Sequence, residues 1–301
     1  MNRKTFLQQV GFLTAGSILS PTLFKLTKQS SPFTTLGDNI GFFTGRGGTI
    51  GWFVTDDSIV AIDSQFQNSA EEFLNGIGEY GSGPSRILFN THHHGDHVSG
   101  NGAFTSSNYQ IIAHENVPML QRRTAEQQGN LDSVVAADIT FDEQYSVDLG
   151  SETIIAKHYG RAHTSGDSVI WFENNNIAHM GDLVFNRWYP FIDRNGGALI
   201  QGWISLLETV SDEADSNTRF IFGHANSEFG VTGNRNDLLY MRDFLSKLLE
   251  HTQQGINAGM SREEITSVEQ FDEFPDHQSA GARLSLTANL DVAYLELTDG
   301  E

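Results

Sequence analysis

Residues 91–97 read Thr91-His92-His93-His94-Gly95-Asp96-His97 and contain the pattern His-x-His-x-Asp-His. Imidazole and carboxylate are the nitrogen and oxygen donors that Zn²⁺ and similar divalent ions bind. In an extended segment His92 and His94 project to the same side, because side-chain direction repeats every two residues. Gly95 then allows a turn that redirects Asp96 and His97 to a second position nearby. This one short loop is therefore expected to serve two adjacent metal ions.

Length, composition and charge limit the classes of protein to consider. The chain has 301 residues, enough to bury a large core. Residues 36–298 contain no linker, charge block or low-complexity run, so we expect a single domain there. The formal net charge is −20, and such a surface repels polyphosphate, so we expect a small-molecule substrate and no nucleic acid. The absence of cysteine excludes disulfides and thiolate metal ligands.

The first 28 residues suggest a location. They are basic and contain no acid, and residues 2–8 resemble a twin-arginine export signal in which Lys4 replaces the second arginine. The mildly apolar stretch 10–24 is too short and too polar for a membrane span, so no stable membrane anchor is expected. We expect residues 1–28 to be an export signal read by the twin-arginine machinery and the mature protein to be periplasmic. A basic amphipathic N-terminal helix is the alternative.

Hydrophobic periodicity and turn residues predict strands with interspersed helices. The predicted strands cover residues 40–44, 49–55, 58–63, 86–89, 109–113, 141–149, 153–158, 168–172, 176–180 and 219–222. Helices are predicted near 69–80, 114–128 and 200–214, and helical stripes continue at 238–248 and 286–297. Residues 69–72 and 261–264 have the pattern of a capping box. Strand-rich stretches of this kind indicate sheets covered by helices, so we expect an α/β (α+β) fold built as a four-layer αββα sandwich.

Two metal ions need more ligands than the loop at 91–97 provides. Three candidates follow it along the chain: His163 in the segment 160–167, Asp182 after Met180-Gly181, and His224 after Phe222-Gly223. Each candidate lies beyond an apolar strand, where α/β sheets usually place their sites. A glycine near each one lets the backbone turn tightly.

In their order and spacing these motifs resemble those of the metallo-β-lactamase superfamily, over nearly all of the chain after the N-terminal segment. The resemblance implies the αββα fold and a set of metal ligands. The first metal would be held by His92, His94 and His163, and the second by Asp96, His97 and His224. The Asp182 carboxylate would bridge the two. One departure is Ala225, since glycine often follows the last histidine in this family.

The resemblance also implies a reaction. Two divalent ions are expected as cofactors, most consistent with Zn²⁺, while Fe and Mn are alternatives because metal availability decides among His/Asp sites. A bridging hydroxide would attack the carbonyl of a lactam, lactone or thioester, since coordination lowers the pKa of water from 15.7 to about 7. Asp96 would be the catalytic residue that orients this nucleophile and moves its proton. The alternatives are a mononuclear iron dioxygenase of the same fold and a protein that binds metal without catalysis.

Three further segments have two interpretations each. The aromatic loop 183–197 either lines the pocket, with Tyr189 and an arginine touching substrate, or packs in the core. The glycine-rich segment 45–48 is either a flap over the site or a plain turn. His93 occupies the variable position of the loop motif and is expected in the pocket or behind a metal ligand.

Overall fold

A computed structural model describes residues 31–299, so the export signal predicted at 1–28 lies outside the described residues. The first sheet runs in chain order across its width, with β1 to β4 antiparallel and β4 to β7 parallel. Its strands are β1 (Phe33–Thr35), β2 (Ile40–Phe43), β3 (Ile50–Val54), β4 (Ser58–Ile62), β5 (Ser85–Asn90), β6 (Gln110–His114) and β7 (Ile139–Phe141). The helices between them are α1 (Gln67–Ile77), α2 (Gly95–Val98), α3 (Asn101–Ser106) and α4 (Asn116–Gln128).

The second half of the described chain forms a six-stranded sheet in the order β15-β13-β11-β10-β9-β8. Its strands are β8 (Gln144–Asp148), β9 (Thr153–Lys157), β10 (Val169–Phe172), β11 (Ile177–His179), β13 (Arg219–Ile221) and β15 (Thr232–Gly233). A separate pair joins β12 (Phe185–Asn186) to β14 (His224–Ala225). The helices are α5 (Ile200–Glu213), α6 (Arg235–Asn257), α7 (Arg262–Thr266) and α8 (Leu286–Asp299), with short 3₁₀ turns η1 (Leu131–Ser133), η2 (Gly181–Leu183) and η3 (Arg194–Gly196).

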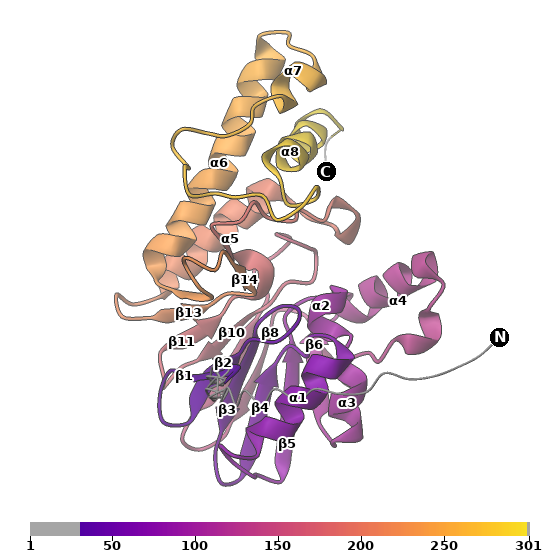
Figure 1. Cartoon of the computed structure of the whole chain (residues 1–301), viewed down its shortest axis with the longest axis vertical. Coiled ribbons are helices and arrows are strands. Elements are labelled where there is room, and N and C mark those ends of the chain that lie inside the picture. Colours follow the sequence, from indigo (N-terminus) through magenta and orange to yellow (C-terminus); the bar gives the residue numbers. More distant parts are fainter. Residues whose placement is uncertain (1–30, 300–301) are drawn as a thin grey trace, which may run out of the picture. The chain divides into compact units, whose positions relative to one another are not determined.

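Four layers arise because the central strands are apolar on both faces. In β3, Trp52 joins the core under α1 and α3, while Phe53 points the other way and packs 6.0 Å from Phe172 of the second sheet. Period-two alternation of this kind buries one set of side chains between the sheets and another beneath a helix. The outer face of the second sheet is covered by α5 and α6, opposite the side that carries α1 to α4, and α8 packs against α6 (Figure 1). The predicted αββα sandwich is confirmed.

Three sequence predictions need correction. The strand predicted over 141–149 is two strands: Phe141 of β7 pairs in the first sheet, and Tyr145 of β8 pairs in the second. Both strands share one alternating pattern, which hid the break between them. Ser69 does not cap α1, because the helix begins at Gln67; its Oγ instead accepts a hydrogen bond from the Arg46 amide at 2.9 Å. The apolar stripe at 286–297 is expected to lie in the core, but its last member, Leu297, is 37% exposed near the end of α8.

The predicted capping box at the start of α7 is present. The Glu264 amide donates to Ser261 Oγ, and the Ser261 amide donates to the Glu264 carboxylate. Among residues 31–299, no helix combines the length and the apolar character needed to span a membrane.

Candidate metal centre

The seven predicted ligands come together in two groups, both of which touch Asp182. The first group contains His92, His94 and His163. The Nδ1 atom of His94 lies 3.1 Å from His92 Nε2 and 3.0 Å from His163 Nε2. Asp182 Oδ2 lies 3.7 Å from the Nε2 atoms of both His92 and His163. Three ring nitrogens and one carboxylate oxygen therefore converge on a single point.

The second group contains Asp96, His97 and His224. His224 Nε2 lies 3.0 Å from Asp96 Oδ2 and 3.4 Å from His97 Nε2. Asp182 approaches this group as well, with Oδ1 3.1 Å from His97 Nε2 and Oδ2 3.5 Å from His224 Nε2. The carboxylate of Asp182 thus lies between the two groups, where a bridging ligand is expected.

Each histidine of the first group is held through its other ring nitrogen. His94 Nε2 donates to the Asp193 carboxylate at 2.9 Å, and His163 Nδ1 donates to the Phe191 carbonyl at 2.7 Å. His92 Nδ1 lies 3.0 Å from Thr91 Oγ1. Such outer partners fix the tautomer and ring orientation, which leaves the converging nitrogens as acceptors for a metal ion.

In the second group a buried carboxylate fixes the orientation of His97 through its outer ring nitrogen. Asp63, directly after β4, accepts a hydrogen bond from His97 Nδ1 at 2.7 Å. The same carboxylate accepts bonds from the amide and the hydroxyl of Thr91, each at 2.8 Å. Because the Thr91 hydroxyl donates to Asp63, it is left as the acceptor for His92. Asp63 therefore supports both groups at once.

Gly181 and Gly223 are needed for the backbone beside Asp182, whereas Gly95 does not form the predicted turn. Helix α2 begins at Gly95 with ordinary backbone geometry, so the predicted glycine turn is wrong and the helix itself redirects Asp96 and His97. Gly181 has φ +51°, and a Cβ there would strike Thr91. A Cβ on Gly223 would overlap Asp182 Oδ1. A larger residue at position 223 would therefore displace the shared carboxylate.

The electrostatics differ between the groups. Burial, and secondarily the neighbouring His94, lower the pKa of His163 to about 3, so this ring is neutral and its Nε2 can bind a metal ion. Burial also opposes charge on His97, but Asp182, Asp96 and Asp63 outweigh it and raise its pKa well above the ordinary value. Burial would raise the pKa of Asp182, yet His224 and His97 hold it well below its usual range.

The donor set fits divalent metal ions. Asp182 Oδ1 is buried and accepts no hydrogen bond of good geometry from any described residue, although His97 lies close to it. A buried carboxylate oxygen without a donor is costly unless a cation satisfies it. Imidazole nitrogens and carboxylate oxygens are ligands that Zn²⁺, Fe and Mn all accept. The arrangement therefore suits divalent metal binding.

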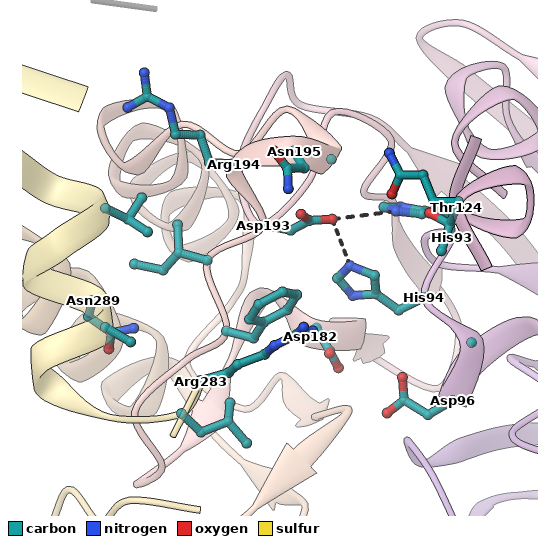
Figure 2. A pocket seen from close by; sticks show the side chains of 18 of the residues that line it. His93, His94, Asp96, Thr124, Asp182, Asp193, Arg194, Asn195, Arg283 and Asn289 are labelled. Carbon is teal, nitrogen blue, oxygen red and sulfur yellow. Dashed lines mark hydrogen bonds and ion pairs between the residues drawn. The ribbon is translucent and has the colours of Figure 1, made fainter. Parts of the chain in front are cut away.

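A pocket of about 810 Å³ opens over these side chains, and Asp96, Asp182 and His224 reach into it. His93, the variable position of the loop, also lines the pocket. Figure 2 shows Asp193 joined to both His93 and His94, whose Nε2 atoms lie 3.4 and 2.9 Å from its carboxylate. Asp193 thus forms part of the pocket wall while it orients a predicted metal ligand.

The aromatic loop 183–197 divides between pocket and core. Phe191 and Arg194 line the pocket. Tyr189 does not; it stacks 5.4 Å from His277 in the core under α6, so its interpretation as a substrate contact is wrong. The segment 45–48 is not among the pocket-lining residues either. The Gly48 amide donates to the Asp96 carbonyl at 3.0 Å, so this turn supports the loop of ligands from behind.

With this geometry described, comparison with known proteins gives the family. The sequence model of the metallo-beta-lactamase superfamily matches residues 53–224, more than half of the chain. The chain belongs to the metallo-β-lactamase superfamily. It is 22% identical over 176 residues to the type 2 metallo-beta-lactamase of Elizabethkingia meningoseptica, a match that covers 58% of this chain and 67% of that protein.

Solved structures share the fold of this superfamily member. The inverting sec-alkylsulfatase Pisa1 from Pseudomonas sp. superposes with a TM-score of 0.67 at 15% identity over 90% of this chain. This chain spans only 51% of that sulfatase. A metallo-beta-lactamase from Pontibacter korlensis gives a TM-score of 0.56 at 18% identity, covering 71% of this chain and 98% of that one. The protein is therefore an enzyme of a hydrolase superfamily with a His/Asp cluster suited to metal.

Sequence reasoning missed Asp63 and Asp193. Asp63 carried a usable signal, because it directly follows an apolar strand at the same edge as the loop of ligands. Asp193 carried none: it lies in an irregular segment far along the chain, and only the tertiary fold brings it to His94.

Proposed function

We propose that this enzyme is a binuclear, zinc-dependent hydrolase that opens a lactam, lactone or thioester at its carbonyl carbon. The observation that carries the proposal is the position of Asp182. Its two oxygens lie within 3.7 Å of nitrogens from both groups, His92 and His163 on one side and His97 and His224 on the other. A carboxylate so placed can hold two ions close enough to act on one substrate.

When bound, the two ions would supply Lewis acidity and an ionised water at neutral pH. The chain's own residues position the reactants. Asp96 is 30% exposed and faces the pocket, so its carboxylate can accept a hydrogen bond from water and orient it toward a carbonyl. His224 holds Asp96 in place at 3.0 Å. The side chains of His92 and His163 lie deeper and are almost fully buried, so they would hold a metal ion and would not touch the substrate.

The experiment combines metal content with a substrate panel. Mass spectrometry of the purified protein should find two metal ions per chain, with zinc dominant. The panel contains a chromogenic cephalosporin, lactones, thioesters and an alkyl sulfate ester, the last because alkylsulfatase structures match most of this fold. Asp96→Asn should abolish turnover, whereas Asp56→Asn, in an exposed turn before β4, is the matched control.

The alternatives predict different results. One iron per chain with oxygen consumption would favour the dioxygenase, and two metals without turnover of any panel member would favour metal binding alone. Hydrolysis by two ions is the proposal that gives a role to every predicted ligand in the two groups.

We further propose that the enzyme works in the periplasm after twin-arginine export. The support is the N-terminal sequence, where Arg3 and Lys4 precede a mildly apolar stretch. Cell fractionation of the wild type and of Arg3→Gln tests this. Export of both variants to the same extent would contradict it.

A further inference from the structure

The pocket over the metal centre contains a cation without a counter-charge. Three arginines line it: Arg123, Arg194 and Arg283. Arg194 pairs with Asp299 at 3.5 Å. Arg123 forms no ion pair with a described residue, but its guanidinium donates to the Asn195 carbonyl. Arg283 is exposed and forms no ion pair with any residue in the part of the chain that the structure describes. Its guanidinium lies over the ring of Phe191, 5.8 Å from the centroid.

The acidic residues of the pocket do not neutralise Arg283. Asp96 and Asp182 face the ligand histidines, and Asp193 is occupied by His93 and His94. The protein as a whole has a net charge of −20, which repels anions at long range. An unpaired guanidinium at the pocket therefore provides a local position where an anionic group is favoured, since Arg binds carboxylate and sulfonate oxygens well.

Arg283 lies in a tight turn, and its guanidinium packs on the ring of Phe191, which also contacts His94. Within the turn the Ala280 amide donates to the Leu284 carbonyl at 3.1 Å, and the Leu284 amide donates to the Gly281 carbonyl at 3.0 Å. The Phe191 ring that lies under Arg283 is also 5.3 Å from the ring of His94. A group bound to Arg283 therefore lies near the predicted ligands of the first metal, across one aromatic ring.

The same side of the pocket is apolar. Helix α8 contributes Ala288, Val292 and Leu295, and Leu284 and Ile192 continue this wall. Figure 2 shows Arg283 and the α8 segment facing His94 and Asp96 across the pocket. Hydrocarbon buried against such a wall gains stability roughly in proportion to its area.

We infer that the pocket binds an amphiphilic anion, with its anionic group on Arg283 and its hydrocarbon along α8. This inference rests on the proposed hydrolase and specifies its substrates as esters, lactones, amides or thioesters that carry both an acyl or alkyl chain and a negative charge. The head group is a carboxylate or a sulfate-type anion, which Arg283 recognises by the same hydrogen bonds.

The test is binding of non-hydrolysable probes to the zinc-loaded full chain, measured by isothermal titration calorimetry. Octanoate and octane-1-sulfonate are the two anionic probes. The one that binds more tightly shows whether the pocket prefers a carboxylate or a sulfate-type head group. Acetate measures anion binding at the metals alone, and 1-octanol measures the hydrocarbon alone. Both eight-carbon anions should bind more tightly than acetate or octanol.

Two variants locate the binding site. Arg283→Gln should weaken octanoate by about tenfold, the usual effect of one charge-assisted hydrogen bond, and leave octanol unchanged. Leu295→Gln should weaken octanoate and octanol but not acetate. Arg262→Gln is the matched control, because Arg262 pairs with Asp291 of α8 and does not line the pocket.

The outcomes separate this inference from the proposed function. Octanoate that binds equally to the wild type and to Arg283→Gln, or no more tightly than acetate, overturns the inference even if the enzyme hydrolyses neutral lactones. Arg283-dependent binding without turnover of any panel substrate supports the inference and counts against the hydrolase.

Discussion

The two halves of the metal centre differ in how their side chains are held. In the first, all three imidazoles are fixed by hydrogen bonds from their outer nitrogens, to Thr91, Asp193 and the Phe191 carbonyl. In the second, only His97 has such a partner. No described residue hydrogen-bonds the outer nitrogen of His224; its ring stacks on Phe185 at 5.4 Å instead.

Exposure follows this division only in part. His92 and His163 are 1% and 0% exposed, and Asp96 and His224 are 30% and 17% exposed at the pocket. However, His94 of the first half is 15% exposed at the pocket, and His97 of the second half is fully buried. The more buried first half is suited to retain an ion, and Asp96 and His224 are suited to meet substrate. The comparison teaches that one centre can both retain an ion and admit substrate, because the hydrogen-bond partners of the outer ring nitrogens are distributed unequally between its halves.

The largest effect is expected from Asp182→Asn, because this residue serves both halves. Metal content should fall below two per chain, and turnover should drop roughly 10³-fold or more, beyond the 10–100-fold typical of an outer partner. Mass spectrometry and steady-state kinetics measure these losses. Retention of two tightly bound metals would show that Asp182 is not shared.

A pair of conservative substitutions tests whether the halves are independent. Asp193→Asn should weaken the first metal by about 10–100-fold and leave the second unchanged, because His94 is the one predicted ligand among its partners. Asp63→Asn should weaken the second metal by a similar factor and the first metal by less, because Asp63 reaches His92 only through Thr91. Since Asp63 is fully buried and accepts three hydrogen bonds, it should also lower the free energy of unfolding. Competition with a chromophoric chelator measures each affinity.

A histidine outside the centre shows what burial does without carboxylates. His277 is 3% exposed, and neither ring nitrogen has a hydrogen-bond partner among the described residues. Burial, and secondarily Arg187, lower its pKa to about 3, whereas carboxylates raise the pKa of His97. Between about pH 3 and about pH 6.5 the unfolded chain binds a proton at His277 and the native protein does not. The free energy of unfolding therefore decreases as the pH falls below about 6.5.

His277→Phe should remove this loss, since phenylalanine can keep the stack that His277 makes 4.2 Å from Phe244. Relative to the wild type, the variant should gain about 2 kcal/mol in free energy of unfolding between pH 7 and pH 5. Urea unfolding of the metal-free wild type and variant at pH 7 and pH 5 measures this difference in the free energy of unfolding. Parallel curves would show that this ring does not titrate on unfolding.

The smallest effect concerns the order of metal release. A chelator should remove zinc in two phases, and the faster phase should come from the more exposed second half. Asp63→Asn should accelerate mainly the faster phase, and Asp193→Asn should accelerate only the slower one. A single phase in the wild type would mean that the two halves lose their ions together.

Much of this molecule was predictable from its sequence because the predicted ligands follow apolar strands closely. The four layers follow from strands such as β3, where every residue is buried. His92 to His97, His163, Asp182 and His224 each carry a local motif. What sequence could not supply depends on contacts between distant segments. Asp193 meets His94 across 99 residues, and the break between β7 and β8 depends on which sheet each strand joins.

The seven ligands come from both sheets, with His92 to His97 after β5 of one and His163, Asp182 and His224 after strands of the other. Ions bound here would act as cross-links between the two layers, because separating the sheets would pull the ligands apart. Loading the centre should therefore raise the melting temperature of the whole sandwich, by an amount that increases with metal concentration.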